Sequence, residues 1–146
     1  MSINDELKRI ESMLEGGNYC VFLRAYDVDH VADAAPEAIV AQCLPDAVFG
    51  NAVMIDSSSM LADFDRDLQY RGDDSHGPHA GVVDSAAFHE LFQSVRSPVE
   101  TLCGSATQIY EFFLRDGHPA YPVFWDHAFL FRFGSRSTIL IGSSSD

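Results

Sequence analysis

Basic residues are scarce in this sequence. Lys8 is the single lysine, and nine lysines and arginines together face 22 aspartates and glutamates, which gives a formal net charge of −13. Binding to nucleic acid depends on basic side chains that neutralise phosphates, and anionic membrane surfaces attract proteins through the same side chains. The charge balance therefore excludes nucleic acid as an ordinary partner and disfavours a membrane surface.

Long hydrophobic runs are also missing. No apolar stretch of the sequence approaches the roughly 20 residues that a membrane-spanning helix needs. Residues 1–17 are polar and mixed in charge, without the basic and then apolar pattern of a secretory signal. We therefore expect a cytoplasmic protein.

Cysteine is rare and unpaired in the sequence. Cys20, Cys43 and Cys103 are widely spaced, and no two of them form a C-x-x-C motif. This excludes a zinc ribbon and a thioredoxin-like dithiol. Each cysteine has apolar neighbours, so we expect reduced, buried thiols that pack as small hydrophobic residues.

Motifs of catalysis and cofactor binding are absent. The sequence contains no G-x-S-x-G nucleophile elbow, no G-x-G-x-x-G fingerprint and no phosphate-binding Walker loop. His89-Glu90 begins like the zinc-protease motif H-E-x-x-H, but Gln93 replaces the second histidine. The sequence therefore predicts neither an enzyme nor a cofactor.

What is present favours one α+β domain that spans residues 1–146. Hydrophobic residues make up 47% of the chain, which suffices for a single core at this length. The periodicity of apolar residues predicts helices and strands without a regular βαβ alternation. We therefore expect a small, mostly antiparallel sheet with helices packed on one face and a C-terminal β-hairpin.

The expected elements follow from their patterns and stop signals. Helices are predicted over residues 3–14, 57–70 and 85–95, between Asp33 and Pro45, and from a capping box at Ser97-Pro98-Val99-Glu100 to Gly117. Strands are predicted over residues 18–27 and 47–55, the latter with a bulge or turn at Gly50-Asn51, and over residues 128–133 and 138–141 of the hairpin. Residues 143–146 are expected to form a frayed tail.

The negative charge is concentrated in the first half of the chain. Residues 27–74 contain eleven acidic and two basic residues, which leaves −9 in that segment. On the helix predicted over residues 57–70, Asp63 and Asp67 share one flank and Asp65 lies on the other. Carboxylates four residues apart on a helix repel one another, and a cationic partner would relieve this repulsion.

We therefore predict a partner-binding face built from acidic residues and tyrosines. Tyrosines surrounded by charged residues are frequent energetic centres of protein interfaces. The predicted face contains Asp63, Asp65, Asp67, Tyr70, Asp73 and Asp74, with Tyr26, Asp27 and Asp29 as further candidates.

Two alternatives explain the same residues differently. Asp73, Asp74, His76 and His79 offer oxygen and nitrogen ligands for a metal ion and would make the protein a small metal-binding module or metal-dependent enzyme. A calcium loop is disfavoured, because Leu68 takes the place of its required glycine. In the second alternative, the acidic residues reflect only the background composition of the proteome, for example one adapted to salt. The protein then has no acidic face dedicated to a partner.

The chain resembles the small acidic immunity proteins of bacterial toxin systems, including contact-dependent inhibition and other polymorphic toxins. The resemblance rests on size, on the acidic residues from Asp63 to Asp74 and on the C-terminal stretch WDHAFLFRFGSRSTILIGSSSD. It implies binding to a cognate basic toxin, often a nuclease, whose active site or substrate path the protein blocks. No individual functional residue is carried over from these proteins.

Overall fold

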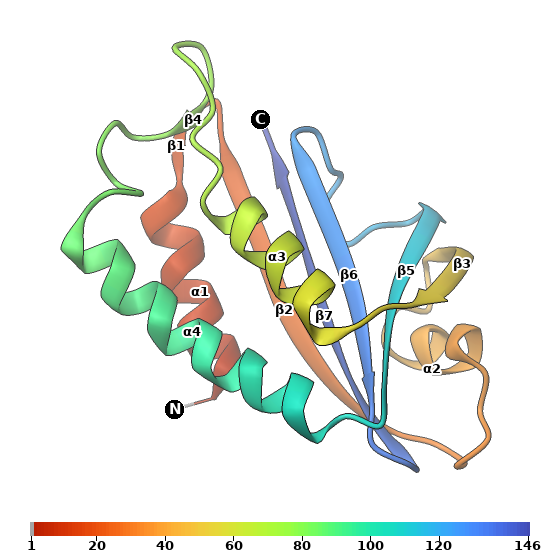
Figure 1. Ribbon diagram of the computed structural model, residues 1–146. Coiled ribbons are helices and arrows are strands. Elements are labelled where there is room, and N and C mark those ends of the chain that lie inside the picture. The colour runs from red at the N-terminus through yellow and green to blue at the C-terminus, as the bar shows by residue number, and fades with distance from the viewer. Residues whose placement is uncertain (1) are drawn as a thin grey trace.

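A computed structural model describes residues 2–146 and shows a five-stranded antiparallel sheet and four helices (Figure 1). The sheet contains β2 (Cys20–Asp29), β7 (Arg136–Ser145), β6 (Trp125–Arg132), β5 (Gln108–Asp116) and β3 (Val48–Met54), in that order across it. The helices are α1 (Ile3–Leu14), α2 (Pro36–Cys43), α3 (Ser57–Leu68) and α4 (Ala86–Ser105), and the two-residue strands β1 (Gly16–Gly17) and β4 (Gly77–Pro78) pair separately. The predicted α+β class is confirmed. Within the described residues, no helix has both the length and the apolar character to cross a membrane.

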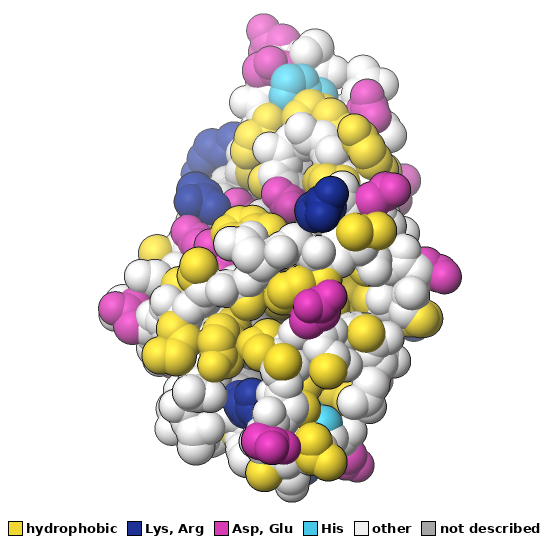
Figure 2. All heavy atoms as spheres, turned by 90° about the vertical axis from the view of Figure 1, so that its right-hand side faces the viewer, with side chains coloured by type: hydrophobic (Ala, Val, Ile, Leu, Met, Phe, Trp, Pro, Cys, Tyr) yellow, Lys and Arg dark blue, Asp and Glu magenta, His cyan; other side chains and the backbone are white. Residues whose placement is uncertain are grey.

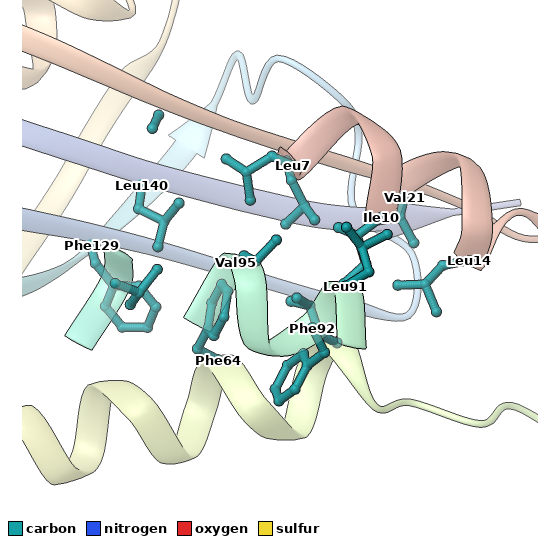
Figure 3. Close-up of a cluster of buried hydrophobic side chains, with 14 of the residues drawn as sticks. Leu7, Ile10, Leu14, Val21, Phe64, Leu91, Phe92, Val95, Phe129 and Leu140 are labelled. Atoms are coloured by element: carbon teal, nitrogen blue, oxygen red, sulfur yellow. The ribbon is translucent and has the colours of Figure 1, made fainter. Parts of the chain in front are cut away.

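Three helices cover one face of the sheet. Ile10 of α1, Phe64 of α3 and Val95 of α4 are fully buried there, in one cluster with Val21, Phe129 and Leu140 of the sheet (Figure 3). Burying a side chain of this size contributes about 1.5–3 kcal/mol. This face therefore holds the main core, as expected for helices packed on one side.

The fourth helix, α2, departs from the predicted arrangement. Its buried residues Ile39 and Val40 pack with Leu130 and Ile141 on the opposite face of the sheet. Successive strand residues point to opposite faces, so β6 places Phe129 in one cluster and Leu130 in the other. The central strands are consequently buried on both faces, which explains their continuous apolar sequence.

The structure contradicts the predicted helix from Ser97 to Gly117. The helix α4 continues through Pro98 instead of starting there, and the strand β5 follows it. Ile109 of β5 is buried in one core cluster and Phe112 in the other. The aromatic and β-branched residues of this segment pair with both β3 and β6, and this tertiary pairing overrides the weak helical pattern.

The C-terminal hairpin of β6 and β7 is confirmed, but the predicted frayed tail is wrong. The strand β7 extends to Ser145, which pairs with Cys20 of β2. Ser143 and Ser144 are each 1% exposed. The small polar residues are ordered because β7 lies between β2 and β6 and pairs with both.

The cysteines are free, as predicted, yet differ in burial. Cys103 is buried, Cys43 is partly buried and Cys20 is exposed on the edge strand β2. The expectation of three buried thiols therefore holds for Cys103 alone.

Candidate functional site

The acidic residues of α3 lie on two flanks, as the helical spacing predicts. Arg66 donates from Nη1 to Asp63 Oδ1 at 3.1 Å and from Nε to Asp67 Oδ1 at 3.2 Å. On the other flank, Arg96 of α4 donates to both carboxylate oxygens of Asp65, at 2.9 and 3.0 Å. Two arginines of the chain itself thus offset part of the charge that the sequence assigned to a partner.

Asp67 is buried and does not belong to a binding surface. Its residue exposure is 3%, and its Oδ2 lies 2.9 Å from His127 Nδ1. This distance places the Asp67 carboxyl group and the His127 ring in a hydrogen bond within the core. The structure therefore removes Asp67 from the predicted partner-binding set and gives it a role in the core.

His127 is the partner of Asp67 that sequence reasoning missed. Its ring stacks between Trp125 and Phe129, at centroid distances of 5.4 and 5.3 Å. An added Cβ at Gly142 would lie 2.7 Å from its Nε2, which has no hydrogen-bond partner among residues 2–146. This closed packing keeps Nε2 from acting as a base on a substrate.

A signal for the burial of Asp67 was present in the sequence. Met60, Phe64, Asp67 and Leu68 follow the spacing i, i+4, i+7 and i+8 of one helix face. The spacing places Asp67 at the margin of the inward stripe, but it does not name His127 as the buried partner.

The loop over residues 71–81 is organised by Asp73. Its Oδ1 accepts hydrogen bonds from the Ser75 backbone N–H at 2.8 Å, the Ser75 hydroxyl at 2.7 Å and the His76 N–H at 3.1 Å. These bonds, first those from Ser75, lower the pKa of Asp73. Asp73 and Asp74 are both exposed, so a partner can reach either carboxylate, although that of Asp73 already accepts these bonds from the loop.

Tyr70 belongs to a stack of aromatic rings. Its hydroxyl lies 2.9 Å from His76 Nε2, and its ring stacks on Tyr19 and Phe124 at centroid distances of 5.6 and 6.0 Å. Burial raises the pKa of Tyr19 to about 12. The stack holds the loop against the body of the protein and leaves Tyr70 only partly exposed.

The geometry does not support the metal alternative. His76 stacks on Phe124 at a centroid distance of 4.2 Å and faces Tyr70 with Nε2, while His79 is exposed. Within residues 2–146, no group of three or more His, Cys, Asp or Glu side chains is arranged to hold a metal ion. This applies to Asp73, Asp74, His76 and His79, the ligands of the metal alternative.

The other predicted contacts lie at a different end of the sheet. Asn18, just before β2, donates to the Ser75 carbonyl at 2.9 Å, so the loop over residues 71–81 adjoins the start of this strand. Asp27 and Asp29 are exposed at its end, and ten strand residues span about 30 Å. Tyr26 packs beside the α2 cluster. The structure thus does not unite these residues with Asp73 and Asp74 in one face.

A corner of the sheet between α3 and the edge strand β3 carries exposed residues that the sequence analysis did not select. Val53 of β3 pairs in register with Glu111 of β5, and Phe113 follows on the same face of β5. Glu111 lies near Asp63 of α3, which raises the pKa of Glu111. Val53 and Phe113 are 44% and 46% exposed. We call Val53, Asp63, Glu111 and Phe113 the β3–β5 corner.

Negative charge accumulates at the β3–β5 corner. The pKa of Glu111 is raised, first by burial, then by neighbouring Asp63 and further by Asp126, while Arg66 lowers it. Arg66 also bonds to Asp63 and Asp67. Its single positive charge is therefore shared among three neighbouring carboxyl groups, those of Asp63, Asp67 and Glu111. Glu111 escaped the sequence analysis because its segment was assigned to a helix.

The protein shares its fold with a structurally characterised protein. No family model matches the chain, and no curated protein does. Two crystal structures of citrus MAF1 superpose with TM-scores of 0.62 and 0.56, at 10% and 12% sequence identity. These matches cover 98% and 99% of this chain and 99% of each MAF1 chain. At this identity the likeness establishes the fold alone.

Proposed function

We propose that this protein is an immunity-type inhibitor that binds and neutralises a basic protein toxin, such as a nuclease, in the cytoplasm. The net charge of −13 supports this proposal, because an acidic surface accelerates the encounter with a basic protein. A nuclease needs basic residues to hold phosphates. An acidic inhibitor that pairs with those residues competes directly with the nucleic acid substrate.

The observation that supports the proposal most is the composition of the β3–β5 corner. Asp63 and Glu111 share one site beside the exposed side chains of Val53 and Phe113. Protein interfaces often combine an apolar centre with charged groups around it. A lysine or arginine of the toxin would relieve the repulsion between the carboxyl groups while Phe113 becomes buried. Asp74 offers a second, exposed carboxylate on the loop.

The proposal is tested by measuring association with the protein encoded by the adjacent upstream gene. We expect a complex at low salt whose association rate falls steeply as salt is added. Glu111→Gln should slow association and weaken its salt dependence. Glu90→Gln is the matched control, because Glu90 is exposed on α4, which lies across the molecule from β3 (Figure 1).

Two results would contradict the proposal. The first is the lack of a complex at low salt with folded samples of both proteins. The second is a complex whose association rate is the same at all salt concentrations and in both variants.

A further inference from the structure

The two edges of the sheet differ in how their backbone groups are satisfied. At the β2 edge, the Leu23 N–H donates to the carboxylate of Glu11 at 2.8 Å. The Ala25 N–H donates to Asn4 Oδ1 at 2.8 Å, and the Ala25 carbonyl accepts from Asn4 Nδ2 at 2.9 Å. Side chains of α1 therefore close this edge against another strand.

The β3 edge is open. The Ile55 N–H donates to the Ile109 carbonyl at 3.0 Å, and antiparallel pairing alternates along the strand. Val53 therefore bonds inward to β5, while the N–H and carbonyl groups of Ala52 and Met54 point away from the sheet. Among residues 2–146, no group forms a hydrogen bond with these outward groups. Such an edge is a template for another strand.

Apolar side chains surround the open edge. Met54 is 63% exposed, and Val53 and Phe113 of the β3–β5 corner lie on the other face of the same strands. Figure 2 shows the side of the molecule that carries β3 and α2, where hydrophobic side chains gather across the middle with acidic and basic side chains around them. Exposed apolar surface beside free backbone groups is typical of strand-addition sites.

We propose that the β3 edge binds an extended, basic segment of the partner protein as a sixth strand of the sheet. This inference rests on the proposed function and specifies how the toxin is held. A second copy of this chain fits poorly, because each copy carries a net charge of −13 and Asp56 and Glu111 lie beside the edge. A basic segment has the complementary charge.

The length of the free edge limits the bound segment. Register shifts on both sides of Phe49 confirm the predicted bulge at Gly50-Asn51 and interrupt regular pairing there. The regular part runs from Asn51 to Ile55, which accommodates four or five residues of a partner at about 3.3 Å per residue. The partner segment is therefore short.

The two faces of the edge favour different side chains. An added strand lies about 4.8 Å from β3, so a lysine or arginine beside Val53 reaches across it toward Glu111. On the other face, an apolar residue of the partner would lie beside Ala52 and Met54. The bound segment should thus alternate basic and apolar residues.

One end of the edge offers a further carboxylate. A shallow pocket of about 270 Å³ is lined by Met54, Asp56 and residues of the α4–β5 connection. The pKa of Asp56 is lowered by the hydrogen bonds from Ser59, so its carboxylate is ionised at neutral pH. A basic side chain that follows the paired residues can bind there.

The test uses a synthetic hexapeptide of alternating lysine and valine and nuclear magnetic resonance of the labelled protein. We expect the amide signals of Ala52 and Met54 to shift and to exchange more slowly with solvent. The hexapeptide with glutamate in place of lysine should not bind. Met54→Pro removes one outward N–H, a change that edge strands tolerate, and should weaken binding about tenfold relative to Met54→Ala.

Several outcomes would overturn strand addition. These are shifts confined to other elements, equal affinities of Met54→Pro and Met54→Ala, or a concentration-dependent dimer that Met54→Pro abolishes. Melting curves of both variants establish that they are folded. If the whole toxin binds both variants equally and retains its salt dependence, the inferred binding mode fails while the proposed function stands.

Discussion

Asp67 and His127 illustrate how a single buried pair fixes the position of a helix. The carboxylate comes from α3, the imidazole from β6, and the two meet at 2.9 Å with almost no access to solvent. Such a pair is costly to bury but more costly to break, because the remaining partner is left uncompensated in the core. Asp67 therefore serves the fold rather than a partner.

The first prediction concerns this pair. Asp67→Ala should lower the free energy of unfolding by about 3 kcal/mol, measured by urea denaturation. Asp67→Asn, which retains an acceptor for His127 Nδ1, should cost less. Asp74→Ala is the control and should change stability by no more than about 0.5 kcal/mol. Equal stability of Asp67→Ala and Asp74→Ala would show that the buried pair does not support the fold.

The second prediction concerns Glu111, whose pKa is raised above the ordinary value of 4.5 by burial and by Asp63. The folded state therefore holds this proton more tightly than the unfolded chain does. Ionised Glu111 costs stability above its folded pKa, and the cost disappears as the pH falls below 4.5. Glu111→Gln should stabilise the protein at pH 7 but not at acidic pH, as thermal unfolding at several pH values will reveal. A variant that is less stable than the parent at pH 7 would contradict this account.

The sequence predicted the positions of several site residues but not their surroundings. The spacing of Asp63, Asp65 and Asp67 placed them correctly on the two flanks of α3, because helical periodicity is a local property. Their ion pairs with Arg66 and Arg96 and the burial against His127 depend on tertiary packing. Local sequence patterns therefore could not distinguish Asp63 and Asp65, which are accessible to solvent, from Asp67, which is buried.

At the scale of elements, the helix α4 passes through a residue that disfavours helices. Pro98 lies inside the helix, where proline lacks a backbone donor and crowds the preceding turn. Val95 and Val99 on either side of it are fully buried. Packing of this face holds the helix together across the defect.

The third prediction follows from that defect. Pro98→Ala should restore a backbone hydrogen bond and raise the free energy of unfolding by about 1 kcal/mol or more. The gain is smaller than the full cost of a proline in a helix, because alanine also makes the unfolded chain more flexible. Denaturant titration measures the change. An unchanged or lower stability would indicate that the surrounding structure depends on the proline.

The strand β5 explains why the sequence assigned part of the sheet to a helix. Its apolar residues fit a helical stripe when read from Val99 onward, and Ser97-Pro98 resembles a helix start. In the folded protein, Ile109 and Phe112 point into the two core clusters on opposite faces of the sheet, and β3 and β6 pair with the strand on either side. These tertiary contacts favour a strand over a helix. The α+β class, α1, α3 and the C-terminal hairpin were predicted correctly because their signals are local and agree with their tertiary surroundings.

The fourth prediction tests the closure of the β2 edge by α1. Asn4→Ala removes two hydrogen bonds to the Ala25 backbone and should lower stability by about 1 kcal/mol. Hydrogen exchange at the Ala25 amide should accelerate. Ser12→Ala, on the exposed side of the same helix, is the control. An unchanged exchange rate at Ala25 would contradict the closure.

At the scale of the whole molecule, the net charge of −13 affects stability as well as encounter with a partner. Like charges repel most strongly in the compact state, and salt screens them. The fifth prediction is that the melting temperature rises between low salt and about 0.5 M sodium chloride, and rises less for Glu111→Gln. A melting temperature that falls with salt would indicate that attractive ion pairs dominate the surface.

The β3–β5 corner and the adjoining β3 edge are the proposed binding site for a basic partner. Hydrogen–deuterium exchange of the protein with and without its basic partner tests this location most directly. We predict slower exchange in β3 and in β5, with α1, α4 and β2 unchanged. Protection concentrated on α4 or on β2, with β3 exchanging as in the free protein, would contradict it.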